Sequence, residues 1–152
     1  MRYVPTGVPA SDIHIVWEKA WPLLQKAIDR FPDTPNKLDE GMVLKGLFRR
    51  QMQLWLAWDA EEDKPVGAVV TEIMAHEKFP GKVFLSGSLL GGENFRAWID
   101  DLWAVIKAWG IESGCTHMYG SGRRGWVRWF GMVECGTAED TGLPIYVRTL
   151  KR

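Results

Sequence analysis

The sequence contains little cysteine and little histidine. Two of its 152 residues are cysteine and three are histidine. Cys115 and Cys135 are too few for a disulfide framework and fit no paired metal-ligand spacing. His14 and His76 show no ligand spacing either. We therefore expect no metal site and a reduced, cytoplasmic location.

The sequence also lacks net charge and long apolar runs. Nineteen basic residues balance nineteen acidic ones, so the chain has no overall electrostatic attraction to nucleic acid or to an anionic membrane. No apolar run approaches the roughly 20 residues that span a bilayer, and the first residues have no apolar signal-peptide core. We expect neither a nucleic acid nor a membrane partner.

Tryptophan, in contrast, is abundant, with nine residues in the chain. Large aromatic side chains dominate both cores and interfaces. One hypothesis is that one or two tryptophans lie at a protein partner surface or line a cleft. The alternative is that all nine are core or half-buried residues.

The length predicts a single domain over residues 1–152. Apolar residues spaced three and four apart predict a helix over residues 11–31, which Pro22 should kink or divide. A second, shorter helix is predicted over residues 36–50. From Gln51 the period changes to two, which indicates a β-hairpin that extends to Met74.

The second half alternates strands with helices. A long amphipathic helix is indicated by an apolar stripe that runs from Phe95 to Trp109. The other predicted elements are a strand at 82–88, a Gly91-Gly92 turn, a strand at 115–119, a short helix at 123–130 and strands at 132–135 and 145–150. This order predicts an α/β fold with a mixed sheet, mostly antiparallel, and with helices on both faces.

The order of elements resembles the Gcn5-related N-acetyltransferase (GNAT) family over nearly the whole chain. The helix that ends in Ala108-Trp109-Gly110-Ile111-Glu112-Ser113-Gly114-Cys115 is similar to the family's entry to the next strand. Trp129-Phe130-Gly131-Met132 resembles the end of the family's final helix. Residues 122–126, Gly-Arg-Arg-Gly-Trp, look like small members associated with bacteriophages.

The resemblance implies acetyl-CoA as a cofactor. In the family the pantetheine arm lies where one strand splays from its neighbour, and the pyrophosphate lies on amides at the start of the next helix. The matching residues here are Ser86, Ser88, Gly91, Gly92, Glu93 and Asn94. Ser88 stands where the family has glutamine or arginine, and the charge of Glu93 disfavours a phosphate.

The resemblance also suggests catalytic groups. Glu72 is a lone carboxylate in an apolar strand and is the candidate base; the alternative is that it points to solvent. Tyr119 is the candidate acid, because tryptophans occupy the family's usual tyrosine helix; the alternative is a strand-end residue without chemistry. Arg123, Arg124 and Trp126 are candidates for binding a substrate or partner, and the two arginines are otherwise simply solvated.

Two functions follow from these residues. One is an acetyl-CoA-dependent N-acetyltransferase that acts on a small amine or a protein amine. The other is a non-catalytic binding or structural protein with the same fold, such as a phage virion component or a protein that acts on host proteins.

Overall fold

The computed structural model describes residues 1–33, 37–75, 79–121, 130–139 and 141–151. Within these residues, seven strands form one sheet in the order β1-β2-β3-β4-β5-β7-β6. All neighbouring strands are antiparallel except β4 and β5. The elements are β1 Tyr3–Val8, α1 Ile13–Ile28, α2 Glu40–Phe48, β2 Met52–Asp59, β3 Lys64–Ala75, β4 Val83–Gly92, α3 Phe95–Glu112, β5 His117–Ser121, β6 Val133–Thr137 and β7 Pro144–Thr149.

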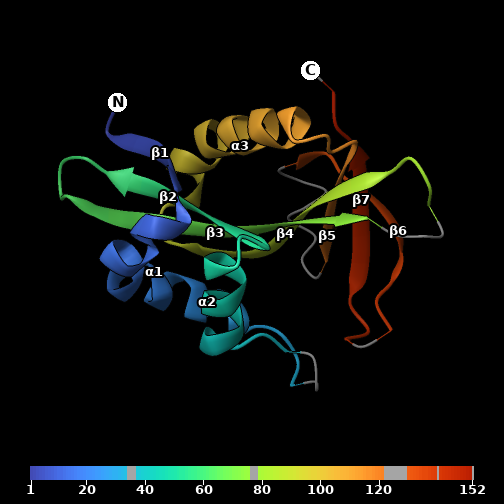
Figure 1. The fold of residues 1–152 in the computed structure, drawn as a ribbon, viewed down its shortest axis with the longest axis horizontal. Coiled ribbons are helices and arrows are strands. Elements are labelled where there is room, and N and C mark those ends of the chain that lie inside the picture. The colour runs from blue at the N-terminus through green and yellow to red at the C-terminus, as the bar shows by residue number, and fades with distance from the viewer. Residues whose placement is uncertain (34–36, 76–78, 122–129, 140, 152) are drawn as a thin grey trace.

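The sheet is covered on both faces, as the sequence predicts. Helices α1 and α2 lie against one face and α3 lies against the other (Figure 1). Successive strand residues point to opposite faces, and each face therefore has its own core. The core on the α1 and α2 face includes Leu24, Leu47, Leu54, Val70 and Leu89. The core on the α3 face includes Trp55, Val69, Leu85, Trp98, Leu102, Ile106 and Met118.

Several predicted boundaries are wrong. Strand β1 is absent from the prediction, because Pro5 and Gly7 interrupt its pattern, yet it pairs with β2 along its whole length. Helix α1 contains Pro22 without dividing into two pieces. The short helix predicted at 123–130 lies outside the described residues, apart from Phe130.

The predicted turn at Gly91 and Gly92 is also wrong. Strand β4 continues through both glycines, which pair with Ala68 and Gly67 of β3. A Cβ at Gly91 would overlap the backbone carbonyl oxygen of Leu23 in α1, and one at Gly92 would overlap the backbone of β3. These glycines therefore allow close packing of backbone against backbone.

The described tryptophans are all at least partly buried. Trp126 and Trp129 lie outside the described residues, which leaves seven of the nine. Trp55 and Trp98 are buried, and the other five are half-buried. Among the described residues, these exposures fit the alternative of core and half-buried positions.

Candidate functional site

The main feature of the site is a separation of β4 from β5. The two strands pair only between Phe84 and Ser86 on β4 and between His117 and Tyr119 on β5. Among the described residues, β4 pairs only with β3 beyond Ser86, whereas the end of β5 pairs only with β7. A gap therefore opens between the carboxyl ends of two parallel strands, which is where ligands bind in many α/β sheets.

Backbone groups of β4 face this gap. The Glu93 N–H donates to the Val66 carbonyl oxygen at 2.9 Å, and successive amides of a strand point to opposite edges. The N–H groups of Leu90 and Gly92 therefore point away from β3, toward the side where β5 has separated. These N–H donors suit a ligand whose amide carbonyl oxygens can accept hydrogen bonds.

A β-bulge adjusts β4 at the start of the gap. Val70 pairs with Leu89 and Thr71 pairs with Gly87, so Ser88 is the additional residue of the bulge. Bulges bend a strand and reorient its side chains, and they are common beside active sites. Here the bulge directs the Ser88 hydroxyl toward Ser86 and Glu72, at 3.4 Å from the Ser86 hydroxyl and 3.4 Å from the Glu72 carboxylate.

The two predicted catalytic residues lie in one row across the sheet. Glu72 pairs with Ser86, and Ser86 pairs with Tyr119. Side chains that pair across strands share a face, so Glu72 and Tyr119 both lie on the face of α1 and α2. Two strand spacings separate their Cα atoms by roughly 10 Å.

The same face carries a pocket of about 200 Å³ beside this row. Ser88, Tyr119 and Ser121 supply its polar wall from the two sides of the gap. The rest of its lining comes from the end of α1, from β4 and from the loops before α2 and β7, and includes Ile28, Phe31, Pro32, Lys37, Leu38, Leu89, Ala138 and Thr141. Sequence reasoning missed Ser121, although it follows Tyr119 by the strand period of two.

A small apolar hollow of about 20 Å³ lies on the opposite face, between the sheet and α3. Its lining includes Leu85, Gly87, Leu90 and Met118, which are residues of the two separating strands. Hollows therefore adjoin β4 and β5 on both faces of the sheet.

The predicted phosphate-binding corner has a different geometry. Only Glu93 and Asn94 connect β4 to α3. The Glu93 amide is bonded to Val66, and its carboxylate lies 3.4 Å from the Lys26 ammonium. Asn94 has a left-handed backbone (φ 57°), and its side chain donates to the Tyr3 hydroxyl at 3.4 Å. Gly91 and Gly92 therefore form no open cradle for a pyrophosphate, because backbone atoms of α1 and β3 occupy the space beside them.

Arg123, Arg124 and Trp126 lie outside the described residues. His117 lies on β5 with its Nδ1 atom 2.7 Å from the Thr116 hydroxyl and its ring beside Phe84. In the described residues, no three His, Cys, Asp or Glu side chains are grouped to hold a metal ion. No helix in the described parts of the chain is long and apolar enough to span a bilayer.

Comparison with solved structures identifies the fold. The chain is similar to an aminoglycoside 6'-acetyltransferase type Ii, with a TM-score of 0.68 and 10% identity over 98% of each chain. It is also similar to ribosomal-protein-S5-alanine acetyltransferase from Vibrio fischeri, with a TM-score of 0.65 and 11% identity over 99% of this chain and 94% of the other. FeeM, an N-acyl amino acid synthase from uncultured soil microbes, has a TM-score of 0.65 and 13% identity over 98% of this chain and 90% of its own.

The chain therefore has the fold of the Gcn5-related N-acetyltransferases, as the order of its elements predicted. No protein-family model matches the sequence, and no curated protein matches it. The similarity lies in the arrangement of the elements and at most weakly in the residues. Nothing in these comparisons supports the predicted bacteriophage origin, which stays a prediction.

Proposed function

We propose that the protein is an acetyl-CoA-dependent N-acetyltransferase. The observation that supports this function best is the gap between β4 and β5, with the Leu90 and Gly92 amides along one side and Glu72 and Tyr119 at its start. The similar structures include acetyltransferases and an N-acyl amino acid synthase, which supports acyl transfer as the class of reaction. Bound acetyl-CoA would supply a thioester whose carbonyl carbon is open to attack by an amine.

Glu72 is the candidate general base in this proposal. An amine attacks only in its neutral form, so a group must remove its proton. The Glu72 carboxylate is half-buried, and the Ser88 hydroxyl donates to it. Glu72 accepts the proton of the amine, directly or through one water molecule.

Tyr119 is the candidate general acid. Cleavage of the thioester releases a thiolate, which a phenolic O–H can protonate. Tyr119 lines the pocket on the other side of the gap from Ser88. Glu72 and Tyr119 therefore lie on opposite sides of the position that the thioester would take. Glu72 can reach the attacking amine while Tyr119 reaches the departing thiolate.

A non-catalytic binding protein is the second candidate function. The observation in its favour is the corner between β4 and α3, where the Glu93 amide is already bonded and Glu93 places a carboxylate near the helix start. A carboxylate near this helix end competes with a phosphate for the same positive charge. On this alternative the gap would hold a partner's backbone.

Calorimetric titration with acetyl-CoA tests the proposed function. Leu90→Pro removes one amide that faces the gap, and proline is tolerated where a strand's N–H group is not used by the sheet. We expect binding by the unmodified protein at micromolar concentrations and at least roughly tenfold weaker binding by Leu90→Pro. Leu85→Pro on the same strand is an unsuitable control, because Leu85 is buried in the core. The control is therefore Val105→Ala on the exposed side of α3, which should bind acetyl-CoA normally.

No binding by the folded, unmodified protein would exclude the transferase. Equal binding by Leu90→Pro, with its circular dichroism spectrum unchanged, would place the cofactor away from the gap. Binding that is weakened only by Leu90→Pro would justify a screen of amine acceptors with thiol release as the signal.

A further inference from the structure

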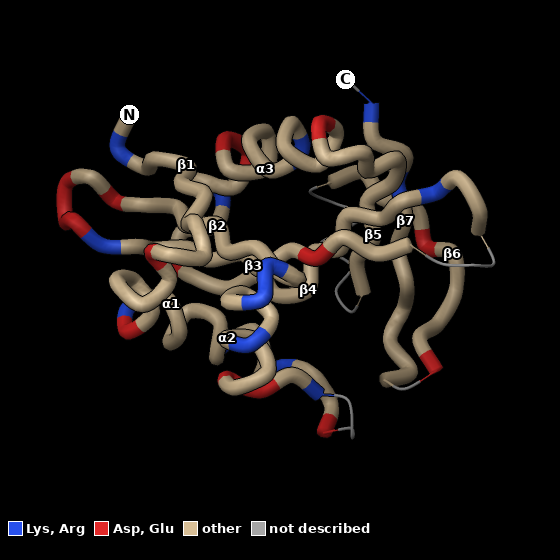
Figure 2. Tube along the Cα trace, viewed as in Figure 1, with Lys and Arg blue, Asp and Glu red and all other residues tan. Residues whose placement is uncertain are grey.

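Three positive side chains gather at the C-terminal end of α2. They are Lys45, Arg49 and Arg50, and the sequence from Gly41 to Trp58 contains no acidic residue. Within the described parts of the chain, none of the three side chains forms an ion pair or a hydrogen bond. Figure 2 shows the basic positions of α2 and of the turn that follows it grouped below the sheet. The charge-neutral chain thus has a local excess of positive charge.

The backbone of Arg50 adds a second observation. Arg50 follows the end of α2 and has a φ of 62°, a left-handed conformation that favours glycine. The Gln51 N–H donates to the Gly46 carbonyl at 2.9 Å and the Arg50 N–H to the Leu47 carbonyl at 3.1 Å, which is a Schellman cap. A side chain at this position costs conformational energy, and within the described residues the exposed Arg50 side chain forms no hydrogen bond or ion pair that offsets it.

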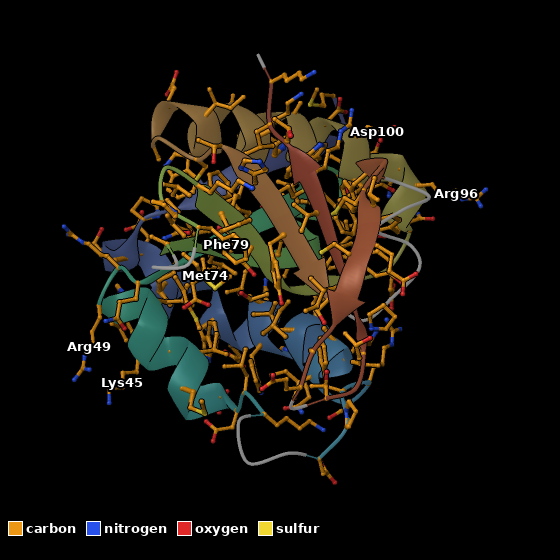
Figure 3. All side chains as sticks on the ribbon, turned by 90° about the vertical axis from the view of Figure 1, so that its right-hand side faces the viewer. Lys45, Arg49, Met74, Phe79, Arg96 and Asp100 are labelled. Carbon is orange, nitrogen blue, oxygen red and sulfur yellow. The ribbon has the colours of Figure 1, made fainter. Side chains whose placement is uncertain are left out.

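Exposed apolar side chains accompany these charges. Phe48 is 52% exposed, Met42 is 43% exposed and Phe79 is 49% exposed. Figure 3 shows the Lys45 and Arg49 side chains extending outward from α2, and Figure 1 shows the end of the β3–β4 hairpin farther along the sheet. The Lys82 ammonium lies 5.7 Å from the centre of the Phe79 ring. Large apolar side chains exposed next to positive ones mark a surface for a partner.

This surface continues into the candidate active site. Gly46 of α2 lies so close to Met52 that an added Cβ would be 2.7 Å from the Met52 sulfur. Met52 pairs with Glu72, and Met74 pairs with Phe84. The centre of the Phe84 ring in turn lies 6.4 Å from the centre of the Phe79 ring and 6.4 Å from the centre of the Tyr119 ring. The basic end of α2 and the aromatic end of the β3–β4 hairpin therefore adjoin the row of Glu72 and Tyr119.

We propose that this surface, which extends from Lys45, Phe48, Arg49 and Arg50 at the end of α2 past the row of Glu72 and Tyr119 to Phe79 at the end of the β3–β4 hairpin, binds an acidic polypeptide segment that carries apolar side chains. Its carboxylates meet the three positive side chains, and its apolar side chains cover the two phenylalanines. If the proposed function holds, on which this last step rests, the acetylated amine belongs to that acidic polypeptide.

The chemistry of the surface favours a polypeptide over a nucleic acid. Glu72 pairs with Met52, which packs against Gly46 of α2, and its carboxylate would repel a continuous phosphate backbone that runs from the end of α2 across the sheet. A polypeptide can place a cationic amine toward Glu72 and carboxylates toward Lys45 and Arg49, whereas a nucleic acid has no cationic group to offer. The balanced net charge of the chain also gives no general attraction to a polyanion.

Fluorescence anisotropy with defined probes tests this proposal without any cofactor. The probe is a short fluorescein-labelled peptide of alternating glutamate and phenylalanine with one central lysine. The comparison probes are the same peptide with glutamine for glutamate and a single-stranded oligothymidylate. Each is titrated with the full chain at low and at high salt, since exposed ion pairs weaken with ionic strength.

We expect the acidic peptide to bind at low salt, with the affinity reduced roughly fivefold or more in each of Lys45→Glu and Arg49→Glu. Arg50→Gly should weaken binding while it maintains or raises the melting temperature, because glycine suits the left-handed position. Arg96→Glu, on α3 across the sheet (Figure 3), is the matched control and should bind as the unmodified chain does.

Several results would overturn the proposal. These are no binding of the acidic peptide, equal binding of the glutamine peptide, tighter binding of the oligothymidylate, or equal losses in Arg96→Glu. Because the assay contains no acetyl-CoA, its failure is distinct from failure of the proposed function, which is measured by calorimetry on the same preparations.

Discussion

At the scale of single residues, the candidate site depends on pairing that connects distant parts of the chain. Glu72 and Tyr119 lie 47 positions apart in the sequence and share a row only through Ser86. In the proposed reaction each moves one proton, and removal of one such group lowers a rate by roughly 10²- to 10⁴-fold.

We therefore predict that Glu72→Gln and Tyr119→Phe each lower kcat/KM by about two orders of magnitude or more, with acetyl-CoA affinity unchanged. Both changes preserve the shape of the side chain, so calorimetry with acetyl-CoA serves as the internal control. Steady-state rates measured with an accepted amine decide the outcome. Full activity in either variant would remove that residue from the mechanism.

The two cysteines differ sharply in their surroundings. Cys115 is 5% exposed, and burial raises the pKa of its thiol, whereas Cys135 lies on the exposed strand β6. The thiolate is the reactive form, so a buried thiol with a raised pKa reacts slowly. We predict that a disulfide reagent such as Ellman's reagent modifies one thiol quickly in the native protein and two in denaturant. Cys135→Ser should abolish the fast phase; a fast phase that persists would contradict this assignment.

At the scale of elements, the periodic segments and the hairpin of β2 and β3 could be predicted, whereas the pairing of β1 with β2 could not. The apolar stripe of α3 and the alternation of β2 and β3 repeat over enough residues to identify each element. Strand β1 has only six residues, which include a proline and a glycine, so tertiary pairing with β2 outweighs its weak pattern. Gly91 and Gly92 look like a turn, but their lack of a Cβ serves contact with α1 and β3.

The contact between β3 and α3 shows the same use of glycine. The Trp98 indole lies against Gly67, where an added Cβ would overlap the ring, and the Trp98 N–H donates to the Glu93 carbonyl at 2.6 Å. We predict that Gly67→Ala destabilises the fold by about 1–3 kcal/mol, the usual cost of overpacking. Gly136→Ala on β6 is the control, because nothing lies within 4 Å of its added Cβ. Chemical denaturation measures both, and equal stabilities would contradict the close Gly67–Trp98 contact.

At the scale of the whole molecule, an ion pair ties the N-terminal strand to the sheet. The Arg2 guanidinium donates from Nε and Nη2 to the two carboxylate oxygens of Asp59, both at 3.1 Å, and Asp59 is 2% exposed. The Glu61 N–H also donates to this carboxylate at 3.0 Å. The Arg2 hydrogen bonds, followed by those from the backbone, hold the pKa of Asp59 below its usual value, although burial alone would raise it.

This lowered pKa makes stability depend on pH in a definite direction. An aspartate whose pKa is lower in the folded state stabilises the fold above the unfolded pKa of about 4, and this contribution is lost as the pH falls through the folded pKa. We predict that Asp59→Asn lowers the melting temperature at neutral pH and that its difference from the unmodified protein shrinks below about pH 4. Glu62→Gln, which removes the exposed pair with Lys64, should shift the melting temperature little at any pH. Scanning calorimetry from neutral to acidic pH measures all three proteins, and a difference between Asp59→Asn and the unmodified chain that stays constant through the acid range would show that Asp59 titrates alike in the folded and unfolded states.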